Sequence, residues 1–276
     1  MTTKITIERV IDIATHAADL VTGMQQAGLR NITTKKNETD LVTEADVACE
    51  HFLRAELRSL APGIGFWGEE SNQQPSDDSF WVVDPIDGTV NYAHGLTYSA
   101  VNVALCRGGE VQLGVTVQMP YRRIYWVNKG EGAFLLEPAG GVRQLRVNTA
   151  ATLRSSLLAT GFPYHNGEAE DNNNAEFSYF SPRCLALRIF GAAALDIAQV
   201  AGGMLAAFWE GWLSPWDAAV GALLVREAGG RVTDYNGQPW EFFGPGLVAS
   251  NGLIHDAVIE CIRTARSGLT ERRLAA

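Results

Sequence analysis

The stretch FWVVDPIDGTVNYAHG, from Phe80 to Gly95, raises the question that decides how the chain folds and what it does. Four apolar residues, Phe80 to Val83, predict a buried strand, and two aspartates three residues apart, Asp84 and Asp87, follow it. Asp, Pro and Gly are common in turns, so an ordinary turn is one explanation. The other is that two carboxylates at a strand end bind something positively charged.

Composition and charge limit the partners of the chain. Its 276 residues are 46% hydrophobic and 19% charged, which allows one large core or two fused halves. A formal net charge of −9 argues against nucleic acid and anionic membranes as partners. No apolar run approaches the ~20 residues of a membrane span, and the N-terminal segment has no apolar secretion core.

Four cysteines match neither a zinc site nor a disulfide framework, so we expect reduced thiols in a cytoplasmic protein. They are Cys49, Cys106, Cys184 and Cys261.

Periodicity predicts two helices and then an antiparallel meander in the first half. Apolar residues recur at helical spacing from Ile7 to Val21, and a second helix is expected from about Thr43 to Leu60. The intervening segment KKNETDLVTEAD is polar and is expected to form a loop. The strands are expected at Phe80–Val83, Thr97–Cys106, Val111–Met119, Ile124–Val127 and Ala133–Leu136.

The second half alternates strands and helices. Strands are expected at Leu157–Ala159, Leu205–Trp209, Val232–Thr233 and Leu247–Ala249, and helices at Ala192–Val200, Ser214–Glu227 and Leu253–Thr264. The polar segment from Asn166 to Glu176 is expected to form a loop. Without repeats or a long linker, residues 1–276 are expected to form a single domain of two tightly joined halves, roughly 1–145 and 146–276.

Other acidic residues lie at the ends of predicted elements. Asp46 closes DLVTEAD, Glu69 and Glu70 lie in WGEES, and Asp217 opens a helix in SPWDAAVGALLVREAGG. A site built from these residues and the two aspartates above would offer only oxygen, which suits Mg²⁺, Mn²⁺ or Ca²⁺ and disfavours zinc. If the carboxylates converge, they need a cation, because they would otherwise repel one another strongly.

Each of these residues also has a purely structural explanation. Glutamates such as Glu69 are usually solvated. Asp46 lies three residues after Thr43, and Asp217 three after Ser214, so each aspartate could complete a helical capping box. No single residue decides between the two explanations.

Taken together and in this order, DLVTEAD, GEES, WVVDPIDGT and PWDAAVGALLVREAGG closely resemble the inositol monophosphatase family, over about residues 40–252. That family belongs to the lithium-sensitive, magnesium-dependent phosphatases. The resemblance implies an α/β fold (α+β by some schemes), a five-layer αβαβα sandwich with largely antiparallel sheets. It also implies a homodimer, lithium inhibition and about two to three Mg²⁺ ions per site, with Mn²⁺ as a substitute.

The resemblance implies metal ligands by position. Glu69, Asp84 and the backbone carbonyl of Ile86 would hold a first ion. Asp84, Asp87 and Asp217 would hold a second, with Asp84 bridging the two. Glu69 would also reach a third, weakly held ion and so take part in catalysis.

The resemblance also implies catalytic and substrate-binding residues. Asp46 and Thr89 would orient and deprotonate the attacking water, while Gly88 and Thr89 would offer backbone N–H groups to the phosphate. Lys36 is a further candidate near the metal and phosphate. The substrate contacts implied are Ile86, Asp87, Gly88, Thr89, Gly191, Ala192, Ala193, Glu210 and Asp217.

Hydrolysis of a small phosphate monoester by activated water is therefore the expected reaction, with myo-inositol 1-phosphate as the favoured substrate. Fructose 1,6-bisphosphate, histidinol phosphate and 3′-phosphoadenosine phosphates stay open as alternatives. An aspartyl nucleophile of the haloacid-dehalogenase type is disfavoured, because those enzymes space their aspartates by two residues. A catalytically silent metal-binding regulatory protein would be expected to lack a catalytic residue, and none is missing.

Overall fold

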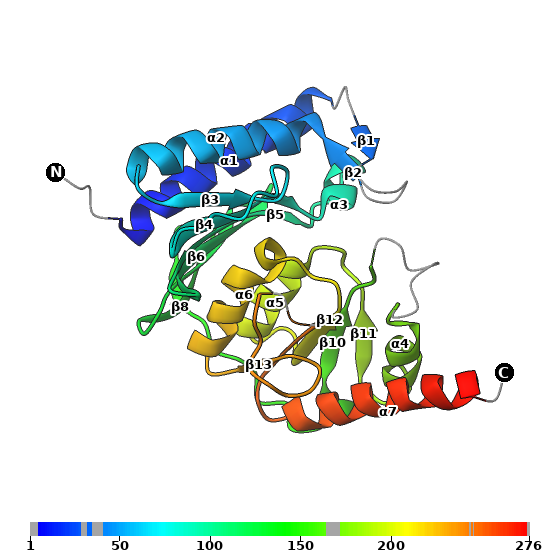
Figure 1. Cartoon of the computed structure of the whole chain (residues 1–276). Coiled ribbons are helices and arrows are strands. Elements are labelled where there is room, and N and C mark those ends of the chain that lie inside the picture. Colours follow the sequence, from blue (N-terminus) through cyan, green and yellow to red (C-terminus); the bar gives the residue numbers. More distant parts are fainter. Residues whose placement is uncertain are drawn as a thin grey trace.

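The computed structural model describes residues 5–28, 32–34, 41–163, 172–242, 244 and 246–274, which fold into alternating layers of helix and sheet (Figure 1). The helices of the layers are α1 (Ile7–Ala27), α2 (Glu44–Leu60), α5 (Ala193–Ala201), α6 (Pro215–Glu227), α4 (Asn174–Phe180) and α7 (His255–Leu274). The pair α1–α2 covers one sheet, α5–α6 lies between that sheet and a second one, and α4 and α7 lie beyond the second. The predicted five-layer α/β sandwich is confirmed.

Within the described residues, the first sheet has seven strands, and the last six form an antiparallel meander. Its strands, in spatial order, are β3 (Gly65–Gly68), β4 (Ser79–Asp87), β5 (Ser99–Arg107), β6 (Glu110–Met119), β7 (Arg123–Asn128), β8 (Gly132–Leu136) and β9 (Val142–Gln144). The first pair is parallel, with Gly68 opposite Val83, and the later pairs are antiparallel. Because parallel strands end at the same edge, the GEES segment after β3 meets the DPIDGT segment of β4.

The second sheet has five strands in the part of the chain that the structure covers. Their order is β11 (Ala186–Arg188), β10 (Leu157–Thr160), β12 (Ala207–Glu210), β14 (Leu247–Ser250) and β13 (Arg231–Thr233). Strand β10 is parallel to both of its neighbours, whereas β14 is antiparallel to both of its own. The sheets are therefore mixed but largely antiparallel, as predicted.

The structure corrects the prediction of a loop at DLVTEAD. Leu41–Thr43 form strand β2, which pairs antiparallel with β1 (Ile32–Thr34). Such a short strand gives almost no periodic signal in the sequence, so only its pairing identifies it. Residues 35–40 lie outside the described part of the chain.

Two further boundaries differ from the predictions. Helix α4 begins at Asn174, inside the segment expected to be a loop, while residues 166–171 of that segment are outside the described ranges. Helix α7 continues to Leu274, beyond the predicted end at Thr264.

Small residues let α6 lie close to both of its neighbours. A Cβ added at Gly221 would lie 2.6 Å from Cγ2 and 2.7 Å from Cβ of Ile197 on α5. On the sheet side, a Cβ at Gly114 would lie 2.9 Å from Cγ1 of Val220. Because α5 and α6 pack on both sheets, we propose that the two halves of the chain act as one domain.

The described helices include none with the length and apolar character needed to cross a bilayer. This agrees with the sequence, where the apolar runs are short.

Gly221→Ala should lower the free energy of unfolding by about 1–2 kcal/mol, because overpacking α5 against α6 outweighs the better helix propensity of alanine. Chemical denaturation of the folded chain measures the change. A second substitution that removes Cγ2 of Ile197 should not restore the stability of this variant, since the Cβ of Ile197 itself lies 2.7 Å from the new methyl group.

Gly23→Ala is the matched control, because Gly23 is exposed within α1 and an added Cβ meets nothing within 4 Å. This variant should instead gain about 0.5–1 kcal/mol. Equal effects of the two substitutions would contradict close packing at the α5–α6 interface.

Candidate metal centre

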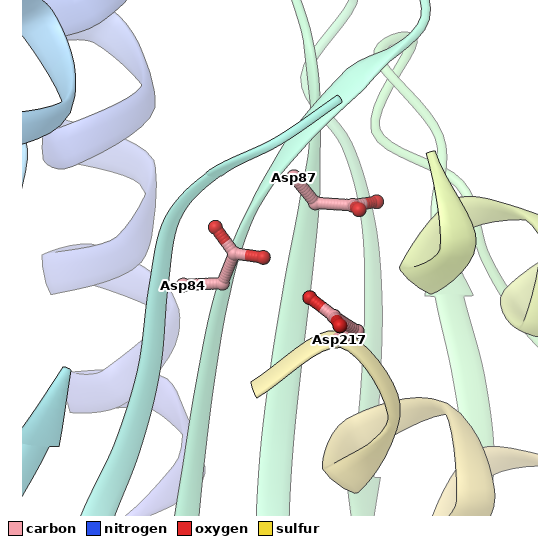
Figure 2. A group of neighbouring side chains, drawn as sticks. All are labelled: Asp84, Asp87 and Asp217. Carbon is pink, nitrogen blue, oxygen red and sulfur yellow. The ribbon is translucent and has the colours of Figure 1, made fainter. Parts of the chain in front are cut away.

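Carboxylates converge at the edge of the first sheet where β3 and β4 end. Asp84, Asp87 and Asp217 each place one carboxylate oxygen within 4.8 Å of the others. Figure 2 shows the three side chains around a common space, two from β4 and one from the start of α6. Gly68 pairs with Val83, so Glu69 follows beside Asp84, and its charge and a hydrogen bond with Asp84 both raise the Asp84 pKa.

A break in the register of β4 brings its two aspartates to the same side. In a regular strand, residues three apart point to opposite faces. Here Asp84 pairs with Asn102 and Asp87 with Ala100, so three steps along β4 match two along β5. The extra residue is a bulge, and Pro85, which has no N–H to pair, lies within it.

Burial and mutual repulsion raise the pKa of both β4 aspartates. Desolvation is the largest cause for Asp84, followed by the charges of Glu69, Asp87 and Asp217. Desolvation also leads for Asp87, followed by the charges of Asp217 and Asp196. A bound cation would reverse this shift, because it favours the charged form. The donors are all oxygens, so the site fits a hard divalent cation.

Asp46 and Thr89, the predicted catalytic pair, are hydrogen bonded to each other. Thr89 Oγ1 lies 3.2 Å from Asp46 Oδ1 and 3.0 Å from the Ile86 carbonyl oxygen. Asp46 Oδ2 accepts from the backbone N and the hydroxyl of Thr43, at 2.8 and 2.6 Å. Asp46 therefore caps α2 with one oxygen and faces Thr89 with the other.

Asp217, like Asp46, caps a helix with one oxygen of the carboxylate that is predicted to take part in the site. Its Oδ2 accepts from the backbone N of Ser214 at 2.7 Å, which closes the capping box of α6. Pro215 occupies the first turn, where its missing N–H costs nothing. The cap thus orients the side chain that joins the cluster.

A glycine lets the segment before α5 approach the end of β4. Gly88 has φ +81°, and a Cβ there would lie 3.0 Å from both the Ala192 Cβ and the Gly191 carbonyl oxygen. The backbone N of Ala194 donates to Asp87 Oδ2 at 3.0 Å. The segment predicted to contact substrate therefore packs directly against the carboxylate cluster.

Glu210 approaches the cluster from the second sheet. It ends β12, and desolvation, followed by the charges of Asp217, Asp196 and Asp87, raises its pKa well above the usual range. A Cβ at Gly161 would lie 2.2 Å from Glu210 Oε2, so the glycine leaves room for this carboxylate. Glu210 thus lies close to the acidic cluster.

The sequence analysis missed two buried acids. Asp196 accepts from the Tyr98 hydroxyl at 2.7 Å, and burial raises its pKa to about 8. Glu50 accepts from backbone N–H groups after β3. The sequence offered one signal for Glu50: it lies one helical turn after Asp46, which puts the two acids on the same face of α2. Lys36, the further candidate for this site, lies outside the described residues.

Comparison with known proteins identifies the family of the chain. The model of the inositol monophosphatase family matches residues 6–267. An inositol-1-monophosphatase from Caulobacter vibrioides is 39% identical over 236 residues, covering 84% of this chain and 91% of that protein. A fructose-1,6-bisphosphatase/inositol-1-monophosphatase from Thermotoga maritima is 34% identical over 232 residues, covering 84% and 86%.

A solved structure shows the same fold. The IMPase from Thermotoga maritima superposes with a TM-score of 0.86 at 30% identity, covering 95% of this chain and 98% of that one. The family model, the sequence relatives and the solved fold agree, so the chain is a phosphatase that belongs to the inositol monophosphatase family.

Proposed function

We propose that this phosphatase hydrolyses a small phosphate monoester with the help of Mg²⁺ held by its acidic cluster. The observation that supports this most directly is the approach of Asp84, Asp87 and Asp217 to within 4.8 Å at a largely buried position. Without a cation, this arrangement leaves carboxylates that repel one another. A hard divalent ion such as Mg²⁺ would offset this repulsion, and Mn²⁺ offers similar chemistry.

The ligands divide between two ions that share one aspartate. Glu69, Asp84 and the carbonyl of Ile86 are proposed for one ion, and Asp84, Asp87 and Asp217 for the other. The location of Glu69 beside Asp84 supports the first set. When bound, the ions supply positive charge to the phosphate and leaving oxygens and increase the acidity of water.

The remaining chemistry belongs to the Asp46–Thr89 pair. The Thr89 hydroxyl can accept a hydrogen bond from water and donate one to Asp46 Oδ1, 3.2 Å away. The Thr89 hydroxyl aligns the water in this way, and Asp46 receives, through Thr89, the proton that the water releases. We assign the backbone N–H groups of Gly88 and Thr89 to the phosphate oxygens. Water is then the nucleophile, and no covalent intermediate is needed.

Substrate specificity is proposed to come from residues that the second half of the chain brings to the site. Glu210 can accept hydrogen bonds from the hydroxyl groups of a polyol, while Gly191, Ala192 and Ala193 line the space beside the sugar or inositol ring. This arrangement favours an inositol monophosphate. The name of the Thermotoga maritima relative covers fructose 1,6-bisphosphate as well, so this ester is the main alternative. Inhibition by lithium and a homodimer follow from the family resemblance, a cytoplasmic location follows from the cysteine pattern, and all three stay predictions.

Phosphate release should be rapid from myo-inositol 1-phosphate with Mg²⁺, absent with a chelator, and inhibited by lithium. The same assay with fructose 1,6-bisphosphate, histidinol phosphate and 3′-phosphoadenosine phosphates ranks the alternatives by kcat/KM. Full activity in chelator would contradict the role of the metal. No release from any ester would favour a silent binding protein.

Asp87→Asn should reduce turnover by more than about 100-fold, because it replaces a proposed ligand of the second ion. It should also raise the melting temperature of the metal-free protein, because one repelling charge is removed, while the increase in melting temperature caused by Mg²⁺ should shrink. Thermal denaturation with and without Mg²⁺ measures both effects.

The pH dependence of this stability follows from the raised pKa values of Asp84 and Asp87. A carboxyl group with a raised folded-state pKa stabilises the metal-free fold at low pH, and this contribution is lost as pH rises through that pKa. The Mg²⁺-induced increase in melting temperature should therefore be larger at pH 8 than at pH 5. The opposite trend would contradict a site that repels its own charges.

Thr89→Ala should lower kcat by about 10²–10⁴-fold, the range expected when an acid–base group is lost. The Mg²⁺ concentration for half-maximal activity should change little, since the hydroxyl is not a proposed metal ligand. Thr89→Ser keeps the hydroxyl and should retain most activity. If alanine and serine at this position behave alike, the proposed relay is wrong.

A further inference from the structure

A buried carboxylate on α2 holds the loop that carries Glu69. Glu50 is only 3% exposed, and its Oε2 accepts from the backbone N of Glu70 at 2.8 Å. Its Oε1 accepts from the backbone N of Ser71 at 3.2 Å. Hydrogen bonds from N–H groups to a buried carboxylate are charge-assisted, so they hold a backbone segment firmly.

Arg54 closes a ring of contacts around the same loop. Its Nη2 donates to Glu50 Oε1 at 3.2 Å and to the Ser71 hydroxyl at 2.7 Å. The guanidinium lies 4.1 Å from the centre of the Phe66 ring, which positions it by cation–π contact. The negative charge of Glu50 is thus paired, as a buried carboxylate requires.

Gly68 leaves room for this carboxylate immediately before Glu69. A Cβ at Gly68 would lie 2.2 Å from Glu50 Oε2 and 2.5 Å from its Cδ. On the other side, the backbone N of Glu69 donates to the Val83 carbonyl oxygen at 3.1 Å. The loop is therefore fixed between β4 and Glu50, and Glu69 leaves it next to Asp84.

We infer that Glu50 is a positioning residue: it holds the backbone at Glu70 and Ser71 so that the Glu69 carboxylate meets Asp84 and the cation. Glu50 does not face the reacting phosphate in this assignment. It sets the affinity for the cation and has little influence on the chemical step once the cation is bound. The inference rests on the proposed role of Glu69 as a metal ligand.

The test is Glu50→Gln, which keeps the size of the side chain but removes the charge that accepts from two backbone N–H groups. The Mg²⁺ concentration for half-maximal activity should rise about 10–100-fold, the usual effect of losing a partner behind a metal ligand. The kcat at saturating Mg²⁺ should stay within about threefold. Calorimetric titration with Mg²⁺ alone should show the same loss of affinity without substrate.

A matched control separates this effect from a general loss of stability. Glu176 is also buried, 1% exposed, and its Oε1 is paired with Arg266 Nε at 2.5 Å in the layer beyond the second sheet. Glu176→Gln should lower the melting temperature without changing the Mg²⁺ requirement. If both variants change that requirement equally, Glu50 has a structural role only.

Arg54→Gln provides a milder second variant, because the Arg54 side chain is 40% exposed and its loss should not prevent folding. It should raise the Mg²⁺ requirement in the same direction but less than Glu50→Gln does. If neither variant alters the Mg²⁺ requirement, the inference is wrong.

Glu69→Gln distinguishes failure of this inference from failure of the proposed function. An unchanged Mg²⁺ requirement in Glu69→Gln would overturn the assignment of Glu69 as a ligand, and the inference with it. A raised requirement in Glu69→Gln together with normal Mg²⁺ binding in Glu50→Gln would overturn the inference alone.

Discussion

Repulsion among the carboxylates at the end of β4 is the constraint on which the rest of the site depends. Asp84 and Asp87 are almost fully buried, and burial and neighbouring charge both oppose their ionisation. A flexible backbone would move such groups apart. The chain prevents this by fixing each one on a rigid element: a bulged strand for Asp84 and Asp87, and a capped helix for Asp217.

The same constraint joins the two halves of the molecule. Asp84 and Asp87 come from the first sheet, whereas Asp217 opens α6, which packs between both sheets. The close contacts at Gly221 and Gly114 fix the position of α6, and with it the distance from Asp217 to β4. The proposed cation binding is therefore linked to the packing of the central layer, so we expect metal affinity to contribute to the stability of the whole fold.

The sequence predicted which acidic residues cluster better than it predicted how they meet. Asp84, Asp87 and Asp217 were found because each lies in a motif with a strong local signal. The parallel strand β3, which brings Glu69 to the same edge, was missed, because four residues carry little periodicity. The bulge after Asp84 was missed for another reason, since it depends on the pairing of β4 with β5.

Structural and functional explanations of the acidic residues turn out to be compatible, because a carboxylate has two oxygens. One oxygen of each aspartate accepts from a backbone N: that of Thr43 for Asp46, Ile86 for Asp84, Ala194 for Asp87 and Ser214 for Asp217. Each such bond offsets part of the cost of burying negative charge and orients the second oxygen. The residues that end the strand and cap the helices are therefore the residues that suit the chemistry.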